Sequence, residues 1–403
     1  MPKQKHILTS IFRQSVILLV FLQIVGQMYA LFTLIDGRVD VTTKIKEQYD
    51  SNIGSSPTDP ISDRILTIRP GAKYLRDAGL VVLNVDVGME VGRFYEDQRL
   101  NYENPQGTVG LSYPNQGESK WQISLNSNYT EASSPNPIIG ERISSETFTT
   151  LGNLRYSILP IYGIGINFVR STIQSNISPS GTRLSDLDQD TMGALFFYKY
   201  SDMLEFTLNY RFRDNQIIGN PADVFSLGDA AKMSGQDETF SVGASGQLTS
   251  LLTGGIDFGG QRRRLNGSDE DLYGLFTSTN LTWQIRPDIT SLALSVSADT
   301  TPTPTNDSIK SLTSSLNLNH TFSPFFSGTA GISYGDTDFT NTPSSGPNSV
   351  SRQDTTYGAS LGFTYNFNEY FTSEFLGAHT WTNTNSGSGY KRTLIELGVN
   401  LKL

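Results

Sequence analysis

The residues that could do chemistry in this 403-residue chain are few, and they form no catalytic pattern. Of its three histidines, His6 lies in a basic N-terminal segment, His320 lies beside a predicted turn, and His379 lies near Trp381. Serine is abundant, so a serine–histidine pair could be drawn in many places, and no motif supports any of them. Cysteine is absent, which excludes disulfides, thiolate metal sites and cysteine nucleophiles. The sequence therefore predicts a protein that is not an enzyme, with no catalytic residues, no cofactor and no metal site.

Three alternating acids, Asp186, Asp188 and Asp190, have the spacing of the first ligands in a calcium-binding loop. Such a loop needs glycine at its sixth position, for a sharp turn, and a bidentate glutamate at its twelfth. Those positions hold Thr191 and Phe197, so the calcium-loop hypothesis fails. We favour a solvated acidic loop, with loose surface binding of divalent ions as the alternative.

Charged residues within alternating runs are more informative. In residues 204–213, LEFTLNYRFR, apolar and polar residues alternate without a break. A period of two is typical of a β-strand with one apolar face and one polar face. If the apolar face contacts lipid, a Lys or Arg on that face near the bilayer midplane would cost about 2–4 kcal/mol, so charges belong on the other face. The candidate residues on that polar, lumen-facing parity are Lys44, Lys46, Arg69, Lys73, Asp86, Glu90, Arg155, Glu205, Arg211, Arg213, Asp257 and Arg263.

The elements that must position these charges repeat from Arg38 to the end of the chain. Each unit has an alternating run, a short turn, another alternating run and a longer polar connection. The last run, Leu394–Leu403, keeps the period of two to its final residue. Left unpaired, such a strand would expose an edge that proteins avoid, whereas pairing it with the first run closes the sheet. We therefore expect an all-β fold, a transmembrane antiparallel up-and-down β-barrel.

The connections alternate between short and long. The long ones are rich in Gly, Pro, Ser, Asn and Asp, and include Asn176–Gln189, Asn215–Gln236 and Asp336–Ser351. Outer-membrane barrels have short periplasmic turns and long external loops, which matches this asymmetry. The runs predict about 18 strands, or about 16 if the weak run Val109–Tyr113 and a neighbour are not strands. The short connections are Asp77–Gly79, Pro114–Ser119, Leu159–Ile161, Ser201–Asp202, Ser250, Arg286–Asp288, Ser323–Phe325 and Asn368–Glu369.

Aromatic residues and composition support the bacterial outer membrane as the location. Several aromatic residues lie near predicted strand ends, where the interfacial girdles of a membrane barrel belong. A soluble propeller would show a constant repeat or a blade motif, and neither is found. The mean hydropathy of −0.27 excludes a bundle of membrane helices, and the net charge of −9 argues against a general nucleic-acid binder. The aromatic residues are Tyr156, Tyr198, Tyr200, Phe212, Trp283, Phe322, Phe325, Phe326, Tyr365 and Phe367.

The N-terminal segment has the composition of a secretory signal peptide. Basic residues precede an apolar run over residues 17–22, and Met28-Tyr29-Ala30 could precede a cleavage site. We expect a signal peptide over residues 1–30 and a single outer-membrane β-barrel over residues 31–403. The alternative is an uncleaved anchor over Val16–Ile35.

The first expected hairpin carries three short motifs: Tyr49-Asp50-Ser51-Asn52-Ile53, Ser62-Asp63 and Ile68-Arg69-Pro70-Gly71. Together they resemble the opening hairpin of the putative β-barrel porin type 2 family of outer-membrane proteins. The resemblance implies a barrel over nearly the whole mature chain and an association with exopolysaccharide. We expect Asp50, Asn52 and Asp63 to shape the first loop, and Pro70 to interrupt strand pairing. Leu403 departs from the terminal aromatic residue that is common in outer-membrane barrels.

Three functions are compatible with these observations. The first is a conduit for exopolysaccharide export, which would depend on a periplasmic polysaccharide-export partner. The second is a general diffusion porin for small solutes, which would conduct alone, and the third is a structural or adhesive surface barrel. The inner charges could pair across strands and fill the lumen, or they could form a mixed, locally basic wall that selects anionic or hydroxyl-rich solutes. The expected partners otherwise are outer-membrane lipid and lipopolysaccharide, whose phosphates Arg262–Arg264 could contact, and no nucleic acid.

Cleavage of the signal peptide is testable directly. We expect N-terminal sequencing of the membrane-inserted protein to start at or close to the residue after Ala30, because the basic start, short apolar run and terminal Ala have the composition of a signal peptide. Recovery of Met1 in the inserted protein would contradict this expectation.

Overall fold

The computed structural model describes residues 32–34, 37–114, 119–136, 141–176, 186–218, 234–266, 271–303, 306–340, 352–385 and 389–402. Nearly all of these residues lie in β-strands, and one short 3-10 helix, η1, covers Gln98–Leu100. Within these ranges no helix is both long and apolar enough to cross a membrane. The predicted signal peptide and Leu403 lie outside the described residues.

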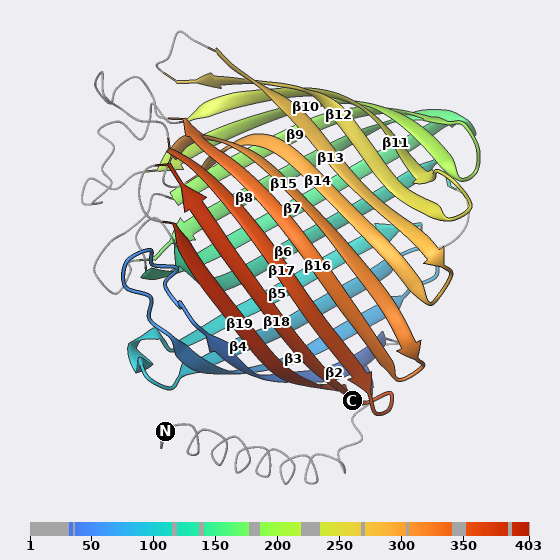
Figure 1. Ribbon diagram of the computed structural model, residues 1–403. Helices are drawn as coiled ribbons and strands as arrows, with labels where there is room; N and C mark the ends of the chain where they lie inside the picture. The colour runs from blue at the N-terminus through green and yellow to red at the C-terminus, as the bar shows by residue number, and fades with distance from the viewer. Residues whose placement is uncertain are drawn as a thin grey trace, which may run out of the picture.

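Eighteen strands, β2 to β19, form one closed antiparallel sheet (Figure 1). Each strand pairs with the next one in the chain, and β19 returns to pair with β2, from Leu394 opposite Asp50 to Lys402 opposite Thr42. The predicted closure and the count of eighteen are confirmed, since Val109–Tyr113 belongs to a complete strand, β5. The short β1 (Phe32–Leu34) pairs with the start of β2. The barrel strands are β2 (Gly37–Asp50), β3 (Asp63–Asp77), β4 (Val82–Phe94), β5 (Tyr102–Tyr113), β6 (Trp121–Asn136), β7 (Glu141–Leu159), β8 (Tyr162–Ser175), β9 (Asp186–Lys199), β10 (Leu204–Ile218), β11 (Gly235–Gln247), β12 (Leu252–Leu265), β13 (Asp271–Arg286), β14 (Thr290–Thr303), β15 (Asn306–Ser323), β16 (Phe326–Thr340), β17 (Arg352–Asn366), β18 (Phe371–Thr384) and β19 (Tyr390–Lys402).

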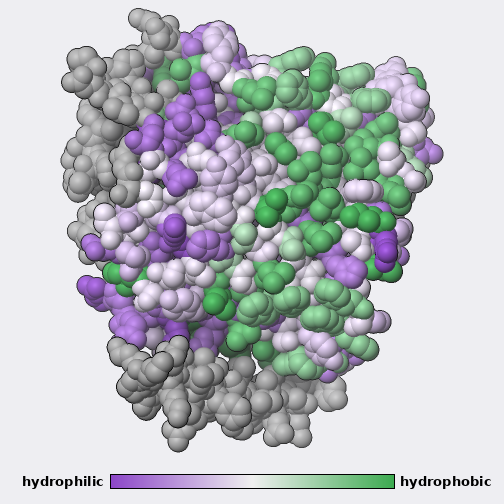
Figure 2. All heavy atoms as spheres, viewed as in Figure 1, coloured by the Kyte–Doolittle hydropathy of each residue, from purple (hydrophilic) through white to green (hydrophobic). Residues whose placement is uncertain are grey.

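The alternation along each strand separates an apolar outer face from a polar inner face. On β10, Phe206, Leu208 and Tyr210 are 44%, 41% and 45% exposed although they are large and apolar, as expected of side chains that contact lipid. Figure 2 shows that hydrophobic side chains gather on the half of the barrel nearer the short turns, and hydrophilic ones toward the long connections. The strands therefore project beyond the apolar band on the side of the long connections.

The predicted short turns all join consecutive strands, as expected. The predicted bounds of the long loops, in contrast, are wrong, because they include residues that belong to strands. Asp186–Gln189 is the start of β9 and pairs with the end of β10, which runs on to Ile218, while β16 continues to Thr340. These ends have the composition of loops because both faces of a strand meet water once it leaves the bilayer, yet its backbone groups still need partners. The remaining parts of these connections are largely outside the described residues.

Aromatic side chains cluster at the short-turn end, where one interfacial girdle was predicted. Trp121 packs on Tyr156 with ring centroids 4.4 Å apart, and Phe322 stacks on Phe326 at 5.1 Å. Both pairs flank short turns and lie on the outer face. Amphipathic rings favour this boundary between lipid and water, so the pairs mark the turn-side edge of the membrane.

Pro70 interrupts the pairing of β3 with β4, as its missing N–H predicts. The ladder is intact at Ile68, opposite Val91, and resumes at Gly71, opposite Gly88. No pairs are formed between these two positions in the ladder. The register is unchanged across the gap, so the interruption is local.

The orientation of the barrel in the outer membrane can be tested with inserted epitope tags. A tag in the connection between β16 and β17 should be accessible on intact cells, because long connections are external in outer-membrane barrels. A matched tag in the turn at Asn368–Glu369 should become accessible only after the outer membrane is permeabilised. Antibody labelling of whole and permeabilised cells distinguishes the two, and the reverse pattern would overturn the orientation.

Candidate functional site

The charged residues that the sequence singled out all lie on the inner face of the barrel, opposite the exposed apolar side chains. Cross-strand partners share a face, and the register connects these positions around the sheet. For example, Arg213 lies opposite Asp237, which lies opposite Arg263. The inner face is therefore the candidate functional site.

Most of the predicted inner cations have an acidic partner. On β2, Lys44 is 2.6 Å from Glu374 and Lys46 is 3.1 Å from Glu396. Neither glutamate was among the predicted site residues. The signal that identifies them is the same alternation, since Glu374 precedes the outward Phe375 and Glu396 precedes the outward Leu397, both of which are exposed.

The other partly exposed pairs differ in how many strands they span. Lys73 and Asp86 are 3.2 Å apart on adjacent strands. Arg155 on β7, however, reaches Glu205 on β10 at 2.6 Å and crosses the two strands between them. Its guanidinium lies 4.1 Å from the centre of the Phe197 ring. Because Gly165 has no side chain, Arg155 can lie flat: a Cβ there would meet the Arg155 side chain at 3.3 Å.

A second group of inner charges is buried. Asp237 lies 2.8 Å from Arg213 and 2.9 Å from Arg263, and Asn215 donates to it at 2.8 Å. Arg213, Arg263 and Asp237 are only 6%, 0% and 1% exposed. Removing one member of a buried ion pair typically costs about 3–5 kcal/mol, so these residues support the fold as well as the charge of the wall.

The buried group is covered by the end of β14, which leaves the wall. Pairing of β13 with β14 stops at Thr277 and Ala298, whereas residues 299–303 stay paired with β15 alone. We call residues 299–303 the inner segment. Its Thr300 is 3% exposed and packs over Gly274 on the inner face of β13, where a Cβ would meet the threonine hydroxyl at 2.6 Å. The inner segment therefore folds inward over the inner face of β13.

Side chains on the inner faces of β12 and β10 hold this segment by its backbone. Gln261 accepts from the Thr300 N–H at 2.9 Å and donates to the Thr300 carbonyl at 2.6 Å. Arg213 also donates to that carbonyl, at 2.7 Å, and lies 3.4 Å from Asp299. These bonds replace the strand partners that Thr300 lost, which explains why buried polar side chains occur there.

A few inner charges have no ion pair in the described part of the chain. Arg69 is exposed, and Asp257 accepts a hydrogen bond from Asn209 at 3.1 Å. Glu90 accepts one from the Tyr102 hydroxyl at 3.0 Å. The remaining member of the predicted set, Arg211, lies 3.6 Å from Asp299 and 4.7 Å from the Phe276 ring centre. The wall thus carries both signs, and most of its cations are neutralised rather than forming a basic surface.

The other residues noted in the sequence lie on the outer face. His320 and His379 each bond a threonine hydroxyl at 2.9 Å and pack beside aromatic rings. The acids Asp186, Asp188 and Asp190 belong to β9 and not to a loop, because their backbone pairs with β10. In the described residues, no group of three or more His, Asp or Glu side chains could hold a metal ion.

The arginine triplet Arg262–Arg264 is divided between the two faces. Arg263 points inward, so the expected lipopolysaccharide contact is wrong for that residue. Arg262 and Arg264 point outward and lie 2.7 Å and 3.6 Å from Asp271. Their contact with phosphate of the outer leaflet stays a prediction.

Comparison with known proteins agrees with this geometry. Residues 227–403 match the model of the family described as "Putative beta-barrel porin 2". The match confirms the predicted family resemblance through residues 227–403, which do not include the first hairpin. A barrel with an apolar outer band and a porin-family match is a bacterial outer-membrane protein with the architecture of a porin-like channel. No curated protein matches the chain.

Solved structures with a similar fold include proteins of two bacteria. The outer membrane protein opdK from Pseudomonas aeruginosa is 10% identical, with 92% of this chain and 100% of that chain covered and a TM-score of 0.51. OpdO from Pseudomonas aeruginosa is 10% identical, with 91% and 98% covered and a TM-score of 0.49. OccAB4 from Acinetobacter baumannii is 11% identical, with 91% and 98% covered and a TM-score of 0.47. At such low identity, the likeness to opdK shows the fold alone.

The role of the inner segment can be tested with Gln261→Ala. Loss of both bonds to Thr300 should free the segment, lower the free energy of unfolding by about 1–3 kcal/mol and increase single-channel conductance and current noise. Gln122→Ala, on the exposed inner face of β6, is the matched control and should leave conductance unchanged. Equal conductance for Gln261→Ala and wild type, both folded, would show that the segment does not restrict passage.

Proposed function

We propose that the protein is a passive diffusion channel for small hydrophilic solutes. The observation that carries this proposal is the ion-paired, polar inner face of a closed barrel, with Lys44–Glu374 and Lys46–Glu396 on one side and Arg155–Glu205 on another. Passage requires contacts that are weak and repeated, so that a solute can leave each site. Partly exposed pairs of opposite charge offer such contacts without holding one ion strongly.

Two segments inside the wall favour small solutes over a polymer. The inner segment crosses from β14 toward β10 and β12, held by Gln261 and Arg213. On another part of the wall, Ile53 of the connection after β2 packs against the inner-face residues Ile65 and Phe94. Both occupy space that a wide conduit would leave open.

Exopolysaccharide export remains a prediction from the family resemblance. It requires a periplasmic partner, whereas diffusion requires the barrel alone. The purified protein distinguishes the two, because only a diffusion channel would conduct without other components. A deletion strain in which no paralogue replaces the protein gives a second test. If the protein does not export polymer, that strain would place normal amounts of polymer on the cell surface. An adhesive or structural barrel would neither conduct nor alter the polymer.

The direct test is reconstitution of the purified full-length protein. We expect stepwise current increments in planar bilayers and entry of monosaccharides into proteoliposomes, with slower entry of longer oligosaccharides. A correctly folded barrel that gives no current and admits no sugar would contradict the proposal.

Ion selectivity should follow the paired charges on β2. In the double variant Glu374→Gln with Glu396→Gln, Lys44 and Lys46 lose their partners, so the channel should become more selective for anions. The reciprocal double variant, Lys44→Gln with Lys46→Gln, should shift selectivity toward cations and serves as the matched control. Reversal potentials in a potassium chloride gradient measure both. Shifts of the same sign, or none, in folded variants would place these pairs outside the solute pathway.

A further inference from the structure

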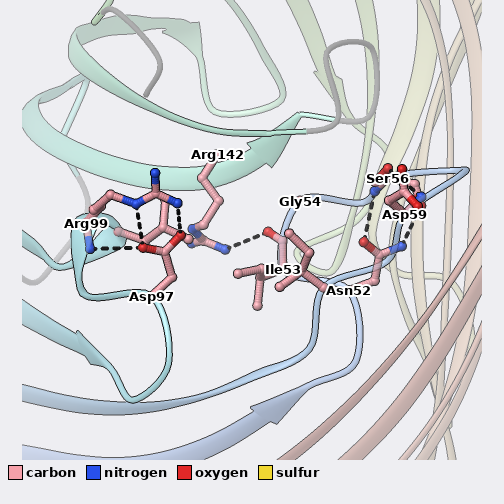
Figure 3. A pocket seen from close by; sticks show the side chains of 10 residues that line it. Asn52, Ile53, Gly54, Ser56, Asp59, Asp97, Arg99 and Arg142 are labelled. Carbon is pink, nitrogen blue, oxygen red and sulfur yellow. Dashed lines mark hydrogen bonds and ion pairs between the residues drawn. The ribbon is translucent and has the colours of Figure 1, made fainter. Parts of the chain in front are cut away.

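A pocket of about 130 Å³ lies between two connections at the end of the barrel that carries the long loops (Figure 3). The connection from β2 to β3 forms one wall, with Asn52, Ile53 and Ser56. The connection from β4 to β5 forms the other, with Asp97 and Arg99, and Arg142 of β7 completes the lining. No residue of this pocket was among the predicted lumen-lining charges.

The β2–β3 wall is held by side chains of the first-hairpin motifs, as the sequence suggested. Asp50 accepts from the Asn52 N–H at 3.0 Å and from Arg392 at 2.6 Å. The Asn52 side chain in turn binds both the N–H and the carbonyl of Ser56, at 2.9 and 2.8 Å. Asp50 and Asn52 are 0% and 1% exposed, so this wall is formed before any ligand arrives.

The opposite wall is held by Asp63. Its carboxylate accepts hydrogen bonds from three successive backbone N–H groups, those of Tyr95, Glu96 and Asp97, at 3.2, 3.0 and 3.0 Å. Asp97 then pairs with Arg99 through two bonds, of 2.9 and 2.7 Å, and this guanidinium lowers the pKa of the Asp97 carboxyl. The carboxylate of Asp97 is therefore already paired with a cation.

Arg142 is the unusual member of the lining. It is 9% exposed, and it has no carboxylate within salt-bridge distance in the described part of the chain. Its guanidinium donates to two carbonyls, that of Ser133 at 2.5 Å and that of Ile53 at 3.4 Å, while its Nε has no partner. A buried guanidinium that touches no carboxylate is costly, and an anion in contact with it would offset that cost.

The acids closest to Arg142 in electrostatic terms are engaged elsewhere. Asp50 is bound by Arg392, and Glu90 accepts from the Tyr102 hydroxyl. A further lining acid, Asp59, is exposed. Figure 3 shows it beside Ser56 and Asn52, well away from the Arg142 guanidinium, which lies between the Asp97–Arg99 pair and Ile53. Asp50 and Glu90 therefore attract Arg142 only over a longer distance, and neither carboxylate is in contact with its guanidinium.

We propose that this pocket binds the oxyanion group of a small solute, with Arg142 as its counter-charge. The inference rests on the proposed diffusion function, since the ligand would be a solute at the entrance of the channel. A cavity of about 150 Å³ admits a six-membered ring, so the pocket has room for a small carboxylate or phosphate compound and not for a polymer. Arginine suits this role because its planar N–H groups match the geometry of both oxyanions.

The test is calorimetric titration of the folded full-length protein in detergent with acetate and with inorganic phosphate, against chloride at equal ionic strength. We expect saturable binding of at least one oxyanion. In Arg142→Gln the affinity should fall by about tenfold or more, the loss expected for a charge-assisted hydrogen bond. Arg142→Lys should retain part of it. The matched control is Arg170→Gln, an exposed outward arginine on β8, which should bind as wild type does.

The outcomes separate this inference from the proposed function. Binding of acetate alone assigns carboxylate solutes, and binding of phosphate alone assigns phosphorylated ones. Wild-type protein that does not distinguish either anion from chloride overturns the inference, and this result stands even if Arg142→Gln fails to fold. Undiminished binding in folded Arg142→Gln also overturns it. Conduction of current without oxyanion binding would leave the channel proposal intact, whereas binding without conduction would contradict only the channel.

Discussion

Hydrogen bonding between β19 and β2 is the contact on which the rest of this structure depends. In hydrocarbon there is no water to satisfy an exposed N–H or carbonyl, so a sheet can cross a membrane only when its edges meet. The pairs from Leu394 with Asp50 to Lys402 with Thr42 achieve this closure. Once the sheet is closed, every strand has two inseparable faces. Apolar side chains on one parity must meet lipid, and polar side chains on the other must meet one another in the interior.

The charged side chains of the interior are compensated in two ways. Where the inner face is partly exposed, Lys44 and Lys46 pair with glutamates on β18 and β19. Where the end of β14 folds inward, Arg213 and Arg263 share Asp237 beneath it with almost no exposure. The first arrangement suits solute passage, because exposed pairs are weak and exchangeable. The second suits rigidity, because a buried pair is costly to break.

At the end of the barrel that carries the long loops, buried polar groups are also compensated, with one exception. Asp50, Asn52 and Asp63 satisfy the backbone and side chains of two connections almost completely, which lets non-repetitive chain pack at the end of a barrel. Arg142 is left with a buried charge and no acid of its own. Since native structures rarely leave a buried charge uncompensated, such a group points to a missing partner, and an entering solute is one that a channel mouth would meet.

The sequence by itself determined the closed barrel, the short turns and the face on which each candidate charge lies, because all three follow from the period of two. Alternation beside Phe375 and Leu397 would also have identified Glu374 and Glu396. It did not determine which charges meet. Arg155 reaches Glu205 three strands away, and Gln261 binds the backbone of Thr300, because strand tilt and an inward turn of β14 bring them together. Loop-like composition hid the outer ends of β9, β10 and β16, since a strand in water has no apolar face to reveal it. Those contacts and the pocket around Arg142 depend on distances between chain segments that no local pattern records, and only the tertiary structure decided them.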